Sequence, residues 1–211
     1  MEIHAPDKPI HSLKDLGIHL ATITAGILIA LSLEGILEWR HHRNLMREAK
    51  ENITIELEGN RKAIEKSLHS LPEQVKNYRN ALDFANDRLE RKHTNIHKMV
   101  IAFNVPSVSA VAWKTAETTG ALGHMKYSEV QKYAEVYDVQ ELYVRAEAQK
   151  LQRVSQVEAI LMGGDPNKAS LQDIESFRQQ ILVSLADLVT EESLAKELSG
   201  AYGKLLSQKQ P

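Results

Sequence analysis

Three residues at the end of an apolar N-terminal stretch have the types and spacing of a metal site. Glu38 and His41 form an E-x-x-H pattern, and Glu34 lies one helical turn before Glu38. In di-iron carboxylate bundles, two such patterns and two further carboxylates converge on the metal ions. A homo-oligomer would bring further copies of these residues together. The alternative is an anchor at a membrane surface, where His and Arg contact lipid headgroups. We favour the anchor and expect no metal or other cofactor.

A second pair, His93 and His97, has a four-residue spacing that would place both rings on one helix face, as a metal site needs. No pattern of carboxylates accompanies this pair, so it makes no complete ligand set. The chain also has no Gly-rich phosphate loop, no H-E-x-x-H, no G-x-S-x-G and no cysteine. We therefore predict no catalytic residue and a protein that is not an enzyme.

The segment from Ala112 to Leu122 carries a tryptophan, a glycine suited to a helix end and a short apolar run. One interpretation is that Trp113 fills the end of a helical core. The other is a pocket for a small ligand or partner, lined by aromatic and apolar side chains. The candidate pocket residues are Trp113, Met125, Tyr127 and Tyr137.

Residues 16–33 read LGIHLATITAGILIALSL and contain no formal charge. At about 1.5 Å per residue they reach about 27 Å, and extension to Leu37 gives about 33 Å, enough for a hydrocarbon core of about 30 Å. A cleaved signal peptide and a buried core helix are the alternatives. The helical pattern continues beyond the stretch, and a basic, aromatic cluster follows it, which favours a retained transmembrane helix. The predicted interface residues are Trp39, Arg40, His41, His42 and Arg43.

One face of this predicted helix combines small and polar residues. Gly26 and Ala30 form a small-x-x-x-small pair, which lets two helices approach closely. Small residues are also common in membrane helices that do not associate. We favour an assembly face that places its polar residues against another copy of the chain. It consists of His19, Thr22, Gly26, Ala30 and Glu34.

Composition predicts the remaining architecture. The 211 residues carry a net charge of −2, which gives no electrostatic case for nucleic-acid binding. Few glycines and prolines, with apolar residues at heptad spacing, favour long helices. We predict an all-α protein with a tail (1–15), a single N-terminal transmembrane helix (16–37) that continues into the next helix, and an antiparallel helical bundle (38–211). A helix over 38–70 would end at Ser70 and Pro72, and a second helix to Leu89 would fold back on it as a hairpin. Further helices are predicted over 108–119, over 128–162 and after Ser170.

Basic residues predict the orientation of the chain in the membrane. Two precede the transmembrane stretch and four follow it closely, so the positive-inside rule places the C-terminal domain in the cytoplasm. The margin is two charges, and a periplasmic domain stays open. The residues counted are Lys8, Lys14, Arg40, Arg43, Arg47 and Lys50.

The sequence GILIALSLEGILEW at residues 26–39, the basic helix after it and a later Trp113…Thr119-Gly120-x-Leu122 pattern resemble a group of bacterial proteins of unassigned activity. Those proteins have one N-terminal span of GILIAL type and a helical domain of similar length. The resemblance covers residues 13–60 well and residues 113–137 loosely. It implies a bacterial inner-membrane protein and assigns no residue a role.

Three functions are consistent with these observations. The first is a membrane-anchored scaffold or accessory subunit, which contacts the lipid bilayer and forms a homo-oligomer or joins a larger membrane complex. The second is a ligand sensor with a pocket near Trp113. The third is a metal-dependent enzyme that uses Glu34, Glu38 and His41. We favour the scaffold because the chain has an assembly face and lacks a catalytic motif.

Overall fold

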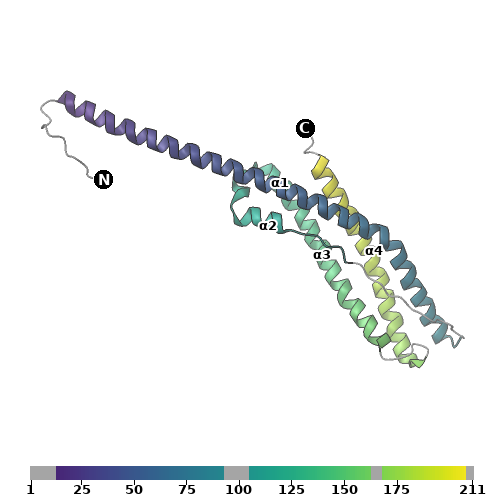
Figure 1. The fold of residues 1–211 in the computed structure, drawn as a ribbon. Coiled ribbons are helices and arrows are strands. Elements are labelled where there is room, and N and C mark those ends of the chain that lie inside the picture. The colour runs from purple at the N-terminus through teal and green to yellow at the C-terminus, as the bar shows by residue number, and fades with distance from the viewer. Residues whose placement is uncertain (1–12, 93–104, 163–167, 208–211) are drawn as a thin grey trace. The chain divides into compact units, whose positions relative to one another are not determined.

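A computed structural model of the chain describes residues 13–92, 105–162 and 168–207 (Figure 1). Its elements are α1 (Leu13–Leu89), α2 (Val111–Thr118), the short 3-10 helix η1 (Ala121–His124), α3 (Tyr127–Met162) and α4 (Leu171–Ser207). These described parts contain no strand, so the predicted all-α class is confirmed. The chain divides into two compact units between Glu48 and Ala49.

Helix α1 passes through Pro72 without ending, so the predicted hairpin after Ser70 is wrong. Pro72 cannot donate to the carbonyl of Leu68, a defect worth about 3 kcal/mol in a helix interior. The buried positions nevertheless continue on both sides of the proline in alternating steps of three and four. Burial of one continuous face therefore outweighs the local defect. The positions of this row are Ile53, Leu57, Asn60, Ile64, Ser67, Leu71, Gln74, Tyr78, Ala81 and Ala85; Ala49 and Phe84 are buried as well.

Helices α3 and α4 each bury a similar row of residues, and we call these rows, with that of α1, the seams. Side-chain contacts between the helices fix their directions. Asn60 of α1 contacts Gln140 of α3, and Gln140 contacts Tyr202 of α4. Ser67 contacts Glu191, so α4 runs opposite to α1 and to α3. Helices α3 and α4 pack along each other (Figure 1). The α4 seam is Ile174, Phe177, Ile181, Ser184, Leu188, Glu191, Ala195, Leu198, Tyr202 and Leu205.

The seam of α3 agrees with the predicted one at Tyr133 and Val154 but lies one residue away from it in the middle of the helix. The apolar pattern predicts that Val144, Ala148 and Leu151 face the core, but all three are exposed. The structure buries the preceding residue in each case. The α3 seam is Tyr133, Val136, Gln140, Tyr143, Glu147, Lys150, Val154 and Val157. Charged and amide side chains thus enter the core because they have partners there, as described below.

Two predicted helix ends are confirmed. Gly120 adopts a left-handed conformation, with φ of 75°, directly after α2, where a residue without a Cβ atom is favoured. At the start of α4, Ser170 Oγ accepts from the backbone N–H of Asp173 at 3.2 Å and donates to Asp173 Oδ2 at 2.6 Å. Helix α3 begins at Tyr127, one residue before the predicted cap Ser128.

Candidate functional site

The apolar part of α1 exposes its large side chains. All nine leucines and isoleucines of residues 16–33 are between 48% and 64% exposed. Within the described residues, α1 is the one helix long and apolar enough to cross a membrane. A continuous apolar surface of this kind normally marks a membrane or protein contact. The nine side chains are Leu16, Ile18, Leu20, Ile23, Ile27, Leu28, Ile29, Leu31 and Leu33.

The predicted assembly face lies within this exposed surface. Its small residues leave room for another helix, because a Cβ atom built on Gly26 would meet nothing within 4 Å. Thr22 Oγ1 donates to the carbonyl of Ile18 at 2.9 Å, so this hydroxyl is satisfied inside its own helix. That leaves His19 and Glu34 as the ionisable groups of the face. All five of its residues are exposed: His19, Thr22, Gly26, Ala30 and Glu34.

The residues after the apolar stretch interact along the helix. The guanidinium of Arg43 lies 5.3 Å from the centre of the Trp39 ring, a cation–π geometry. His42 Nε2 is 3.9 Å from Glu38 Oε1. Arg40 and His41 are exposed. This side-chain arrangement, an aromatic ring under a cation, is the kind found where a helix meets headgroups.

The metal hypotheses find no assembled site in a single chain. Within residues 13–92, 105–162 and 168–207, no three His, Cys, Asp or Glu side chains gather in a way that could hold a metal ion. Glu34, Glu38 and His41 belong to that range. His93 and His97 lie outside the described residues.

The structure brings together two of the four predicted pocket residues. The ring of Trp113 stacks on Tyr137 with centroids 5.2 Å apart and planes 19° apart, and it lies 6.3 Å from the ring of Tyr133. Met125 is buried, whereas Tyr127 is 83% exposed. Trp113 is half-buried in this stack, and Tyr137 is buried.

Glu56 of α1 organises this region, although the sequence analysis did not single it out. Its carboxylate accepts hydrogen bonds from the Tyr137 hydroxyl at 2.7 Å and the Ser109 hydroxyl at 2.6 Å. It also accepts from the backbone N–H groups of Ala112 at 2.9 Å and Trp113 at 3.4 Å. Those N–H groups belong to the first turn of α2, where a helix has no internal acceptors. Glu56 therefore caps α2 from a different helix.

The same network sets the pKa of Glu56. Burial raises the pKa, but the four hydrogen bonds to the ionised carboxylate together lower it below 4.5. Burial also raises the pKa of Tyr137, and its bond to Glu56 raises it further, so Tyr137 stays a hydrogen-bond donor.

Amide side chains continue this network into the seams. Asn60 donates to the carbonyl of Ser109 at 2.7 Å and accepts from its N–H at 2.8 Å. Gln140 Nε2 donates to the same carbonyl at 2.9 Å, and Gln140 Oε1 accepts from Tyr202 at 2.6 Å. Polar groups of α1, α3 and α4 therefore hold the segment before α2 against the core. Asn60 at a heptad position was the signal of this network in the sequence.

A second polar cluster, Glu147–Lys150–Glu191, lies deeper between α3 and α4. Lys150 Nζ donates to Glu147 Oε1 at 3.0 Å and to Glu191 Oε2 at 2.7 Å. The three side chains are only 2–5% exposed. Charged side chains are almost never buried so completely unless they are paired.

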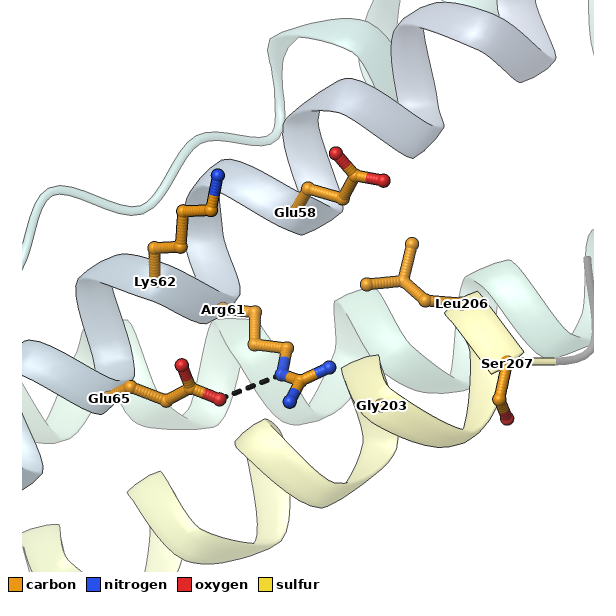
Figure 2. Close-up of a pocket in the computed structure, with 7 residues that line it drawn as sticks. All are labelled: Glu58, Arg61, Lys62, Glu65, Gly203, Leu206 and Ser207. Atoms are coloured by element: carbon orange, nitrogen blue, oxygen red, sulfur yellow. Dashed lines mark hydrogen bonds and ion pairs between the residues drawn. The ribbon is translucent and has the colours of Figure 1, made fainter. Parts of the chain in front are cut away.

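A groove open to solvent lies between α1 and the C-terminal part of α4. Figure 2 shows the side chain of Arg61 directed towards Gly203 and held by Glu65, with 2.8 Å between Arg61 Nε and Glu65 Oε1. Most of its polar groups belong to acidic or basic side chains in equal number, so the groove favours neither anionic nor cationic ligands. Its lining residues are Glu58, Arg61, Lys62, Glu65, Gly203, Leu206 and Ser207.

No family model, curated protein or solved structure matches the chain. The resemblance to bacterial single-span proteins therefore stays a prediction.

Proposed function

We propose that the protein is a membrane-anchored helical scaffold or accessory subunit that acts through protein–protein assembly. In this proposal α1 crosses the bacterial inner membrane with its apolar part. The seams of α1, α3 and α4 form a helical bundle in water, in which α4 runs antiparallel to the other two helices. The partner is a second copy of the chain or another subunit of a membrane complex.

The observation that carries the proposal is the exposure of all nine leucines and isoleucines of residues 16–33. In water these side chains would be an aggregation hazard. In a bilayer each favours insertion by about 0.3–0.6 kcal/mol, so the nine supply about 3–5 kcal/mol together. Trp39 and Arg43 then lie where headgroups would be.

The assembly part of the proposal is supported by the small side chains of the face around Gly26 and by its polar groups, which need a partner. Within lipid, helices associate by close packing and by hydrogen bonds, because lipid tails are as apolar as leucine. Gly26 and Ala30 permit a close approach. His19 and Glu34 are costly in hydrocarbon unless they face a partner or reach the interface.

Mild-detergent extraction of the full chain, followed by mass measurement, tests the proposal. We expect the protein to resist an alkaline wash of the membranes and to run as a multimer or with a co-purifying subunit. Gly26→Leu should lower the assembled fraction at least several-fold, since the larger side chain separates the helices.

Ala21→Leu is the matched control. Ala21 lies roughly 140° around the helix from Gly26, so it is off the proposed face. It should leave assembly unchanged. Release of the wild-type chain by the alkaline wash would contradict the membrane anchor. A monomer without any partner, or equal behaviour of the two variants, would contradict assembly through this face.

The sensor and metal-enzyme interpretations stay predictions. Neither is favoured by a specific observation, because the rings of Trp113 and Tyr137 pack on each other and Glu34, Glu38 and His41 form no cluster in one chain.

A further inference from the structure

The Glu147–Lys150–Glu191 cluster has an unusual charge balance for a buried site. Lys150 Nζ lies between two carboxylates, 2.9 Å from Glu147 Oε2 and 2.7 Å from Glu191 Oε2. With all three groups ionised, the cluster carries one uncompensated negative charge. The side chains are no more than 5% exposed, so water solvates that charge poorly.

Among residues 13–92, 105–162 and 168–207, the other groups around the cluster do not supply a second cation. From α1, the Ser67 hydroxyl donates to Glu191 Oε1 at 3.4 Å. From α3, the Tyr143 phenol interacts with both carboxylates. Burial is the larger cause and the two negative charges the smaller cause of a raised pKa of Tyr143, so the phenol stays neutral. Arg153 lies one turn further along α3 but is already paired with Asp187 of α4 at 2.9 Å.

We propose that Glu147–Lys150–Glu191 is a proton-binding site that holds one exchangeable proton on its carboxylates and weakens the packing of α3 on α4 when that proton leaves. In the bound state one glutamate is a neutral carboxylic acid, and Lys150 balances the other. On release, the O–H bond breaks, the proton passes to solvent water and the acid becomes a second carboxylate. The released state leaves two like charges near one ammonium in the core.

The ligand of this site is the proton itself. The site acts on the packing of α3 on α4, whereas the assembly face acts through contacts of α1 with a partner. Burial raises the pKa of Glu147, the charge of Glu191 raises it further and Lys150 opposes them, with a result of about 7 against an ordinary 4.5. Between these pH values the folded chain binds more protons than the unfolded chain. Its stability contribution is complete below pH 4.5 and is lost as the pH rises through about 7.

Unfolding of the full chain in detergent micelles between pH 5 and 8 tests the site. Glu147→Gln imitates the protonated acid and cannot release a proton. Relative to this variant, the folded-to-unfolded ratio of the wild type should fall as the pH rises, by up to about 100-fold across the window. Glu141→Gln, on the exposed side of α3, is the matched control and should follow the wild-type pH profile.

If Glu147→Gln does not fold, an infrared measurement on the folded wild-type protein provides a second test. The wild type should show a carboxylic-acid band at pH 6 that disappears by pH 8. Glu191→Gln should shift this loss to lower pH, because it removes the neighbouring negative charge. Parallel unfolding profiles for the wild type and Glu147→Gln, or no acid band in the wild type at pH 6, would overturn the proposal.

Discussion

Two glutamates of this chain show how surroundings decide the behaviour of one side-chain type. Glu56 accepts four hydrogen bonds from groups that donate to its ionised form, and its pKa is lowered in spite of burial. Glu147 is more deeply enclosed and shares one ammonium with Glu191, and its pKa is raised to about 7. The two residues therefore make opposite contributions to the pH dependence of stability.

At the residue scale, we predict that Glu56→Gln destabilises the fold by about 1–3 kcal/mol, because charge-assisted hydrogen bonds are lost and an amide N–H₂ faces donors. The contribution of Glu56 is present above pH 4.5 and is lost as the pH falls through its lowered pKa. The wild-type advantage over Glu56→Gln should consequently shrink in acid. Urea unfolding of the full chain at pH 7 and below pH 4 measures both effects.

Glu58→Gln is the control for this change. Glu58 lies on the same helix, two residues away, and is exposed. It should alter stability by less than about 0.5 kcal/mol, as most exposed substitutions do. Equal effects of the two variants would show that Glu56 does not cap α2.

At the element scale, α1 stays helical through Pro72 because burial of its seam outweighs the hydrogen bond lost at the proline. We predict that Pro72→Ala stabilises the protein, because it restores the hydrogen bond to the Leu68 carbonyl. Part of the gain is offset by the greater freedom of the unfolded chain, which leaves a net effect of about 1–2 kcal/mol. Chemical unfolding followed by circular dichroism measures the change.

Lys66→Ala provides the comparison, since it is an exposed helix position without a backbone defect and should be nearly neutral. A loss of stability in Pro72→Ala would mean that the proline favours the native shape of α1. That outcome would contradict our account of how the helix continues.

The heptad spacing of apolar residues was enough to predict an all-helical chain and four residues of the α4 seam, Ile174, Phe177, Ile181 and Leu188. It failed at Pro72 because Ser70 and Pro72 imitate a helix end locally. Only the buried face that continues from Leu71 through Gln74 to Tyr78 shows that the helix goes on. A single sequence gives local signals more weight than this long-range packing.

The functional residues that the sequence missed are polar residues in the seams. Glu147 and Lys150 look like a solvent-exposed ion pair three residues apart, and Val144 and Leu151 look like the core. Their true places depend on Glu191, some 40 residues away along the chain, which only the fold brings near. Helical periodicity places the five assembly-face residues on one side of α1, and their role in assembly stays a prediction.

At the scale of the whole molecule, the proposed membrane anchor requires that the two ends of α1 lie on opposite sides of a bilayer. The chain has no cysteine, so single introduced cysteines report location cleanly. We predict that Ala5→Cys reacts with a membrane-impermeant maleimide in intact spheroplasts, whereas Ser207→Cys reacts only after permeabilisation. The reverse pattern would place the domain in the periplasm. Labelling of both sites in intact cells would contradict a single membrane crossing.

The buried ionic cluster also has a consequence for how the helices find their alignment. Heptad repeats resemble one another, so sliding one helix by seven residues is the natural error of such a fold. A slide of α4 would bring Ser184 or Leu198 to the place of Glu191. Glu191 would then be separated from Lys150, and a buried carboxylate without its cation costs about 3–5 kcal/mol. We therefore expect the cluster to favour the native alignment of α4 on α3 over the slid one.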